Sequence, residues 1–280
     1  MNYSFVNAKL DKYMTYYSVY SGLDNEIGDR KCFFVLDNKN IIGGFTLKNN
    51  ELRYFFIVPP FNDRTLLWNH VLKYSLDNCG KSNINLNSIP EEDKLILTYK
   101  FNAKVTNSYR RMLRPTEKIS ANPPDNFYFA IPDENDKQEI IQAVYEAHSS
   151  AGYITPEQPD KNEITEAINR RWDYFTQTDT LHVSTLVKNS KTNEIAGICM
   201  AGIYPPVTPN CFSIIHQVSV RPQFRRQKIA ESMMLNSIDK ASSISQVTML
   251  NVVVGNPAEL LYSKIGFIGR PIYYDLEYGI

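Results

Sequence analysis

The fold is decided by the stretch Val218-Ser219-Val220-Arg221-Pro222-Gln223-Phe224-Arg225-Arg226-Gln227-Lys228-Ile229-Ala230-Glu231. Its apolar start predicts a strand that ends at Pro222, because proline has no N–H to donate to a sheet. A short loop then brings Arg225 and Arg226 to the first turn of a predicted helix, and Lys228 follows them. Free backbone N–H groups and the positive end of the helix dipole attract anions there. The stretch therefore predicts a site for phosphate groups.

A second informative block follows: Asn251-Val252-Val253-Val254-Gly255-Asn256-Pro257-Ala258-Glu259-Leu260-Leu261-Tyr262-Ser263-Lys264-Ile265-Gly266-Phe267. Asn256 is a residue type that caps helix N-termini, so it predicts the start of a short helix. Gly266 suits the left-handed position after that helix, and Phe267 restarts the sheet.

Together and in this order, the two blocks resemble the GNAT superfamily of acyltransferases. The first is similar to the family pattern V-x-P-x-x-[RQ]-x-x-G-x-[GA], and the second to N-x-x-A-x-x-L-Y-x-K-x-G-F. The chain departs from the first pattern at Lys228, where the family usually has glycine. We expect Lys228 to lie inside the helix, where lysine is accommodated without strain. Its side chain can still crowd bound phosphates.

The resemblance implies that acetyl-CoA binds between two splayed strands, expected here at Cys211–Val220 and Val247–Val254. The pantetheine arm would pair with the backbone of this first strand, and the Val218 N–H would stabilise negative charge on the thioester oxygen. The residues implied in cofactor binding are Val218, Ser219, Val220, Arg225, Arg226, Gln227, Lys228, Ile229, Ala230, Asn256 and Tyr262.

His216 is the candidate general base. It lies four residues before Val220, where arylalkylamine N-acetyltransferases of the family carry a catalytic histidine. Its ordinary pKa of about 6.5 is close to neutral pH. A histidine packed in the core is the alternative. Ile214 and Val218 are its expected neighbours on the same strand face, and they offer no second proton acceptor.

Tyr262 is the candidate general acid. It resembles the family tyrosine that hydrogen-bonds the departing CoA sulfur, a thiolate with an ordinary pKa of about 8.5. A core tyrosine on a short amphipathic helix is the alternative.

Aromatic residues are the candidates for binding the acceptor amine. In the family, the first two helices and their connection line the acceptor pocket, which here implies a lining by His148, Gly152, Tyr153 and Ile154, together with Trp172 and Tyr204. The aromatic members Tyr153, Trp172 and Tyr204 could hold an amine. Aromatic residues at helical spacing also fit a core, and that reading stays open for Trp172.

The length of 280 residues fits two domains. The proline-containing loop 114–126 is the predicted boundary, so we expect a first domain over 1–126 and a catalytic domain over 127–280. Strands and helices follow in the same order in both halves, and aligning Val58 with Val220 also places Pro60 on Pro222. The predicted fold class is α+β, with two tandem GNAT-like domains, each a mixed, mostly antiparallel sheet flanked by helices.

The first domain is predicted to be degenerate and non-catalytic. In the same alignment, Asp63 stands where the second half has Arg225, and Trp68 stands where it has Ala230. A carboxylate and an indole are both unfavourable beside a pyrophosphate.

Composition limits the partners. Thirty lysine and arginine residues balance thirty aspartate and glutamate residues, so no nucleic acid and no anionic membrane are expected. The four cysteines lack metal-ligand spacing, so no metal is predicted. The lack of an apolar leader and of any long apolar stretch predicts a cytoplasmic protein. A homodimer is possible, but no feature of the chain demands it.

The sequence therefore predicts an acetyl-CoA-dependent N-acyltransferase that moves an acetyl group to a primary amine of a small molecule or peptide, by direct transfer in a ternary complex. A CoA-binding sensor or pseudoenzyme without turnover is the alternative, motivated by Lys228. An aminoacyl transferase that uses charged tRNA is disfavoured by the zero net charge and by the intact phosphate loop.

Overall fold

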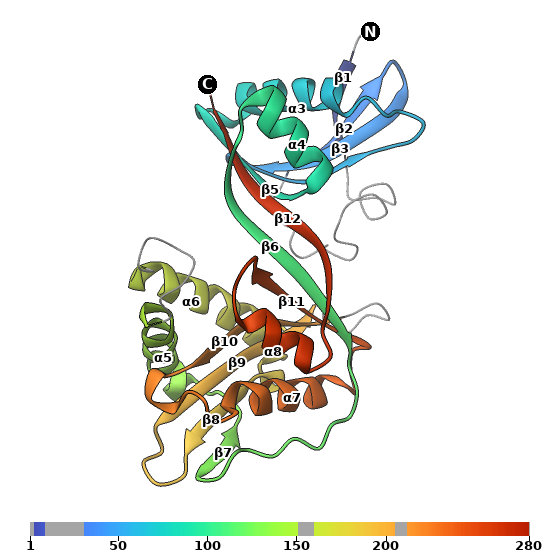
Figure 1. Cartoon of the computed structure of the whole chain (residues 1–280). Coiled ribbons are helices and arrows are strands. Elements are labelled where there is room, and N and C mark those ends of the chain that lie inside the picture. Colours follow the sequence, from blue (N-terminus) through green and yellow to red (C-terminus); the bar gives the residue numbers. More distant parts are fainter. Residues whose placement is uncertain (1–2, 9–30, 151–159, 205–211, 280) are drawn as a thin grey trace. The chain divides into compact units, whose positions relative to one another are not determined.

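The computed structural model describes residues 3–8, 31–150, 160–204 and 212–279 (Figure 1). The chain divides into two compact units, one formed by Met1–Arg110 with Pro271–Ile280 and the other by Arg111–Arg270. This division differs from the expected boundary after residue 126. The loop that follows residue 114 lies within the second unit, and the last ten residues belong to the first unit.

The first unit is a sheet with two described helices. Its strand order is β1-β2-β3-β4-β5-β12, antiparallel throughout except for β4 beside β5. Its core lies between this sheet and the helices α3 and α4, with Trp68, Leu72 and Leu97 almost fully buried. The elements are β1 (Tyr3–Ala8), β2 (Lys31–Asp37), β3 (Asn40–Lys48), β4 (Glu51–Ile57), α3 (Arg64–Cys79), β5 (Asn83–Pro90), α4 (Glu91–Phe101) and β12 (Ile268–Gly279).

The second unit has the strand order β6-β11-β10-β9-β8-β7. The strands β7 to β10 form an antiparallel meander, and β10 pairs with β11 in parallel. The elements are β6 (Lys104–Pro115), β7 (Phe127–Ala130), α5 (Lys137–Ser149), α6 (Lys161–Gln177), β8 (Thr185–Asn189), β9 (Ile195–Tyr204), β10 (Phe212–Val220), α7 (Ile229–Ala241), β11 (Val247–Val253) and α8 (Ala258–Lys264).

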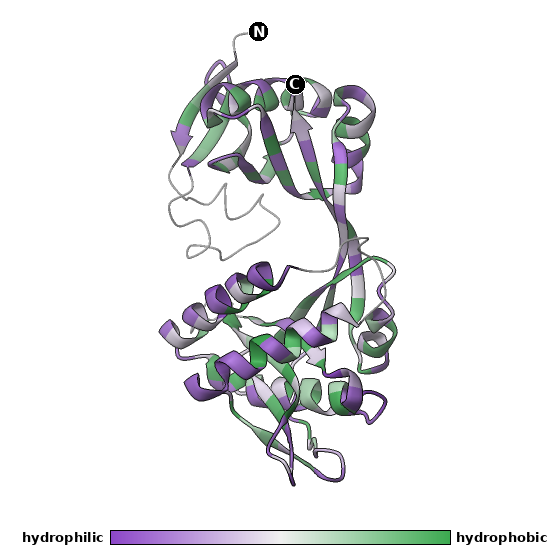
Figure 2. Cartoon of the chain, turned by 90° about the vertical axis from the view of Figure 1, so that its left-hand side faces the viewer, coloured by the Kyte–Doolittle hydropathy of each residue, from purple (hydrophilic) through white to green (hydrophobic). Residues whose placement is uncertain are grey.

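Helices cover both faces of the second sheet. Alternate residues of β9 point to opposite faces: Ile198 and Met200 pack with α5 and α6, whereas Cys199 and Ala201 pack with α7. Figure 2 shows the matching pattern, in which helices carry a hydrophobic side and a hydrophilic side while the central strands are largely hydrophobic. Burial of alternate apolar positions on both faces is what fixes the register of this sheet.

Each unit contains a pair of parallel strands that are hydrogen-bonded over only a few residues. In the first unit, β4 pairs in parallel with β5 only at Glu51 and Leu52, and the register of β4 then shifts around Tyr54. In the second unit, β10 pairs in parallel with β11 only at its start, and its register shifts at His216. The alignment of Val58 with Val220 also places Tyr54 on His216. The repeat that the sequence predicts therefore extends to the same irregularity at the same position.

The last strand of each repeat belongs to the unit formed mainly by the other repeat, an arrangement called here strand exchange. The strand β6 follows α4 of the first unit, yet its end at Arg111–Pro115 belongs to the second unit, next to β11. The strand β12 follows α8 of the second unit, yet Tyr273–Gly279 pair with β5 of the first. Leu276 of β12 is 1% exposed in the core of the first unit. Each sheet is therefore completed by a strand from the other half of the sequence.

Candidate active site

The strands β10 and β11 separate as predicted. Ser213, Ile214 and Ile215 pair with Thr248, Met249 and Leu250, but β10 continues to Val220 and β11 to Val253 without further pairing. Beyond Ile215, β10 pairs only with β9, to which it stays antiparallel as far as Val220. The unpaired edge of β10 is the centre of the candidate site.

A β-bulge at His216 starts this separation. Ile215 lies opposite Ala201 and Gln217 lies opposite Met200, so His216 is the extra residue. A bulge bends its strand and re-aims the side chains that follow. Its position explains why the pairing with β11 ends where it does.

The bulge corrects the predicted arrangement of side chains around His216. Val218 was expected on the same face, but it packs on the α7 side. Gln217 instead shares the face of His216, where its Nε2 lies 3.0 Å from Nε2 of His148 and donates to Ser219 Oγ at 2.9 Å. The site therefore contains a second imidazole, that of His148, which the resemblance implied in the acceptor pocket but whose contact with Gln217 was not expected.

Backbone amides of β10 face the open edge. The Arg221 N–H donates to the Ala196 carbonyl of β9 at 2.9 Å. Because amides alternate in direction along an extended strand, those of Val218 and Val220 point away from β9. These are the amides expected to bind the cofactor, and β11 has diverged from this edge.

The positions of the three cations before α7 differ from the sequence prediction. The helix begins at Ile229, so Arg225, Arg226 and Lys228 precede it rather than form its first turn. Lys228 is its N-cap and has φ 59°, in the left-handed region, and Arg226 has φ 64°. The expectation that Lys228 lies inside the helix is wrong, because the loop needs at this position the conformation that glycine adopts freely.

The N-terminus of α7 offers donors and positive charge together. No side chain caps it, and Arg226, Gln227 and Lys228 are all exposed. Ser232 N–H makes the first helical bond to Lys228 O, so the preceding amides have no partner within the helix. Ile229 is buried against β9, and the neighbouring Ala230 is small and half-buried.

Arg225 has a different place from the other two cations. Its guanidinium donates to the carbonyl of Ala147 at 2.8 Å and to Ser150 Oγ at 2.9 Å, at the C-terminal end of α5. A cation is favourable there because helix C-termini carry partial negative charge. The side chain of Arg225 therefore fixes the loop to α5.

Arg221 is a structural residue that sequence reasoning did not single out. It is 8% exposed and forms ion pairs with Glu194 at 2.6 Å and with Glu146 at 3.3 Å. Glu194 directly precedes β9 and Glu146 lies on α5, so Arg221 connects the end of β10 to both elements. Only its position between Val220 and Pro222 in the family pattern hinted at a role.

The ring of His216 packs against an aromatic side chain. Its ring centroid is 5.6 Å from that of Phe175 on α6. Gly202 of β9 makes room for Phe175, since a Cβ there would lie 2.2 Å from the ring. Burial and the positive charge of Arg171 lower the pKa of His216 to about 3. The imidazole is therefore neutral across the physiological range, which makes it a weak base.

His148 is also affected by Arg171. Burial lowers the pKa of His148, and the positive charge of Arg171 lowers it further. Both imidazoles of the site therefore favour the neutral form, which can accept one hydrogen bond and donate another.

The second block contains the predicted short helix, but the N-cap of α8 is Pro257, one residue after the expected Asn256. Asn256 Oδ1 accepts from the Ala258 N–H at 2.9 Å at the start of α8, and Gly266 has φ +92° just after that helix. Tyr262 is half-buried on α8, with its ring centroid 6.2 Å from that of Phe267.

Of the aromatic candidates for acceptor binding, only the side chain of Trp172 lies within the described residues. Trp172 is 2% exposed in the core formed with α5, and its indole donates to Glu134 at 2.8 Å. This favours the alternative of a core aromatic for Trp172. Tyr153 and Cys211 lie outside the described residues, as does the side chain of Tyr204.

The corresponding part of the first unit is filled by its own side chains. Asp63 caps α3 by accepting from the Leu66 N–H at 2.9 Å. Trp68 is fully buried, its ring centroid lies 3.8 Å from that of Phe55, and its indole donates to Asp93 at 2.9 Å. A carboxylate thus accepts one amide of the first helical turn, and two stacked rings lie beside the bulged strand.

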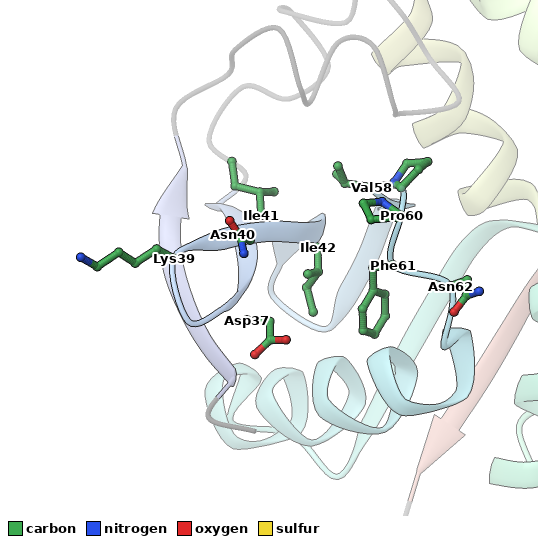
Figure 3. A pocket seen from close by; sticks show the side chains of 10 residues that line it. Asp37, Lys39, Asn40, Ile41, Ile42, Val58, Pro60, Phe61 and Asn62 are labelled. Atoms are coloured by element: carbon green, nitrogen blue, oxygen red, sulfur yellow. The ribbon is translucent and has the colours of Figure 1, made fainter.

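A pocket of about 770 Å³ also lies in the first unit (Figure 3). Its wall includes the segment Val58–Asn62 and the apolar side chains of Ile42 and Phe61, and Asp37 and Lys39 lie at the hairpin beside it. None of the site residues predicted from the sequence lines this pocket.

Comparison with known proteins agrees with this geometry. Residues 141–267 match the family model described as Acetyltransferase (GNAT) family. No match was found among curated proteins. Among the described residues, no helix is long and apolar enough to cross a membrane.

Three solved structures illustrate the fold. A GCN5-related N-acetyltransferase from Sphaerobacter thermophilus superposes with a TM-score of 0.65 at 15% identity, covering 89% of this chain and 80% of that one. A tandem GNAT protein from the clavulanic acid biosynthesis pathway gives 0.65 at 9% identity, covering 99% and 98%. A GNAT-family acetyltransferase from Colwellia psychrerythraea gives 0.62 at 11% identity and covers both chains completely, 100% of each. These identities support a shared fold.

The splayed strands, the strand bulge, the uncapped helix after the loop and the family match all fall in the second unit. The first unit repeats the same order of elements, and the tandem relative covers both units. The matched family is one of acetyltransferases, so the general activity it supports is acyl-CoA-dependent acetyl transfer. Residues 141–267 thus match the GNAT acetyltransferase family, and the chain as a whole shares the fold of a tandem GNAT protein.

Proposed function

We propose that the second unit is an acetyl-CoA-dependent N-acyltransferase, which moves an acetyl group to a primary amine of a small molecule or peptide by direct transfer in a ternary complex. One observation carries this proposal: β10 and β11 separate beyond Ile215, and the open edge of β10 leads to a basic helix N-terminus without a side-chain cap.

The residues of this edge fit acetyl-CoA. The amides before Ser232, with Arg226 and Lys228 exposed beside them, suit a pyrophosphate. The outward amides of Val218 and Val220 suit the amide groups of a pantetheine arm. Arg225 contributes through the loop backbone, because its side chain is bonded to α5. Acetyl-CoA, when bound, supplies an acetyl group activated as a thioester.

In this proposal, three groups of the chain act on the reacting atoms. The Val218 N–H donates to the thioester oxygen and stabilises the negative charge that develops on it. The neutral His216 accepts a hydrogen bond from the acceptor amine and orients its lone pair. The Tyr262 hydroxyl donates a proton to the departing sulfur.

The role of His216 is narrower than that of a strong general base. With a pKa of about 3, its imidazole does not retain a proton near neutral pH, so the amine must lose its proton to solvent or to a water chain. His148, hydrogen-bonded to Gln217 and exposed to solvent, lies on that side of the strand.

We propose one working site per chain. In the first unit, the Asp63 carboxylate accepts the helix amide that an anion would otherwise take. Trp68 is buried and stacked where the second unit has Ala230. The first unit is therefore proposed to be degenerate and non-catalytic.

A calorimetric titration with acetyl-CoA tests the proposal. We expect one site per chain with micromolar affinity, about −8 kcal/mol. Arg226→Glu should weaken binding at least tenfold, because it reverses a charge at the phosphate end. Binding of two molecules per chain would contradict the degenerate first unit. Unchanged affinity in the variant would remove this loop from the cofactor site.

Turnover then separates an enzyme from a sensor. The release of free CoA thiol is followed with a panel of primary amines, and Tyr262→Phe serves as the variant with impaired chemistry. Acetyl transfer to at least one amine supports the enzyme. Tight cofactor binding with no transfer to any amine would favour the CoA-binding sensor.

A further inference from the structure

Arg171 lies beside the two histidines of the candidate site. It is one helical turn before Phe175 on α6, so the two side chains share a helix face, and Phe175 packs on His216. The charge of Arg171 lowers the pKa of both His148 and His216, second only to burial in each case. The guanidinium is therefore within electrostatic reach of both imidazoles.

Within the described ranges, no acidic side chain is paired with Arg171. Nearby acids of α5 and α6 have other cations as partners, namely Glu146 with Arg221, Glu166 with Arg170 and Asp173 with Lys137. The nine residues of β10 include no acid at all.

Arg171 is half-buried, and burial together with the neighbouring Arg170 lowers its pKa. A guanidinium keeps its proton in proteins, so a desolvated one is stable only when an anion faces it. The two imidazoles that its charge reaches, those of His148 and His216, are neutral hydrogen-bonding groups. Among the residues that the structure describes, the Arg171 charge therefore has no acidic partner at the site.

We propose that the acceptor substrate supplies this anion: the second substrate is a small anionic amine, such as an amino acid, whose carboxylate or phosphate group pairs with Arg171. This proposal rests on the proposed acetyl transfer to an amine. It disfavours polyamines and lysine-rich peptides, because their additional positive charges would be repelled by Arg171.

Binding of such a substrate would also raise the pKa of His216. An anion on Arg171 removes one of the two causes that depress the pKa of His216, burial being the other. Within the described part of the chain, Phe175 of α6 packs on His216, Arg171 of the same helix acts on it through its charge, and His148 of α5 lies beside Gln217. Substrate binding therefore makes the imidazole a better hydrogen-bond and proton acceptor when the amine is present.

Paired substrates test the charge requirement. The kcat/KM values for amino acids are compared with those for the corresponding carboxamides, and those for O-phosphoethanolamine with those for ethanolamine. We expect a 10- to 100-fold preference for the anionic member of at least one pair, since a charge-assisted pair is lost in the neutral one. The pair that shows the preference identifies the carboxylate or the phosphate. Equal use of neutral and anionic amines would overturn the proposal.

Variants of Arg171 test the assignment to this residue. Arg171→Met should abolish the preference, and Arg171→Lys should keep part of it. Arg170→Met is the matched control, because Arg170 is exposed and pairs with Glu166, and it should keep the full preference. Unchanged acetyl-CoA affinity shows that each variant is folded. A full preference in Arg171→Met would overturn the assignment.

A binding measurement tests the anion site at Arg171 independently of acetyl transfer. The His216 imidazole is followed by NMR as N-acetylglycine or N-acetylglycinamide is added to the full chain with CoA. We expect only the carboxylate to raise the pKa of His216, and only when Arg171 is present. Saturation by N-acetylglycine without acetyl transfer to any amine would refute the proposed function but leave the anion site supported. Equal responses to the two compounds would refute the anion site.

Discussion

Lys228 carries a backbone conformation that lysine rarely adopts. At φ 59° its Cβ crowds the backbone, a cost of about 1 to 2 kcal/mol relative to glycine. The chain nevertheless keeps lysine at the end of the phosphate loop, next to a helix N-terminus that has no side-chain cap. The charge therefore has a role that offsets the strain, which is consistent with binding of an anion.

Replacing Lys228 separates strain from charge. Lys228→Gly should raise the free energy of unfolding by about 1 kcal/mol, part of the relief being offset by the greater entropy of glycine in the unfolded chain. Lys228→Ala keeps the strain and removes only the charge. Both variants should lose acetyl-CoA affinity to a similar extent. Urea unfolding and calorimetric titration measure the two effects, and equal stabilities of the two variants would contradict the assigned strain.

His216 links stability to pH. Its pKa is about 3 in the folded chain and about 6.5 when unfolded. Between these values the unfolded chain binds the additional proton, so this group makes the folded state less stable as the pH falls below 6.5. The slope is at most about 1.4 kcal/mol per pH unit.

His216→Asn should therefore flatten the loss of stability between pH 6.5 and 4.5, since the amide does not titrate. The measurement is the free energy of unfolding in urea at several pH values. His182→Asn, at an exposed histidine, is the control and should leave the slope unchanged. An identical slope in wild type and His216→Asn would mean that His216 is protonated in the folded chain.

At the scale of elements, α3 and α7 are equivalent helices with opposite N-termini. The helix α3 is capped by Asp63, whereas α7 has no side-chain cap and follows exposed cations. The same position in the repeat thus satisfies its amides internally in one unit and leaves them for an anion in the other. Under the proposed function, this contrast distinguishes a structural from a binding version of one motif.

Asp63→Ala tests this contrast. It should lower the stability of the first unit by about 1 kcal/mol through loss of the cap, with no change in acetyl-CoA stoichiometry, because Trp68 still fills the space beside Phe55. Thermal unfolding and calorimetry measure the two quantities. A second equivalent of acetyl-CoA bound by Asp63→Ala would show that the carboxylate alone blocks the first unit.

The sequence was informative where the pattern is local. The strands expected at Cys211–Val220 and Val247–Val254 match β10 and β11 to within one residue, and Asn256 and Gly266 lie next to the two ends of α8. The bulge at His216 could not be read, because an extra residue in a strand has no distinctive side chain. Its consequence, Gln217 on the same face as His216, was missed for the same reason. The start of α7 was placed too early because arginine and lysine are also good helix formers.

At the scale of the whole molecule, the exchange of β6 and β12 was also beyond the sequence. A strand pattern states which face is buried but not which strand is its neighbour. The last strand was therefore assigned to the half of the chain in which it occurs. The apolar Leu276 was visible, but its burial in the core of the first unit was not.

The exchange predicts an effect far from the mutated residue in the sequence. Leu276→Ala should destabilise the first unit by about 2 to 5 kcal/mol, because the side chain is 1% exposed. Hydrogen exchange on the full chain should show faster exchange in β5 and unchanged protection in β10. Leu260→Ala on α8 is the control, since Leu260 is 78% exposed and should be nearly neutral. Loss of protection in β10 alone would contradict the exchange.

The exchanged strands have a consequence for how the protein is made. During synthesis, domains usually fold in the order in which they emerge, the N-terminal one first. Here the sheet of the first unit lacks its β12 partner until Tyr273–Gly279 have been translated. The first unit thus stays incomplete on the ribosome while the second is made. A message interrupted after the second unit yields a nascent chain with an unpaired edge at β5, exposed to chaperones and to aggregation.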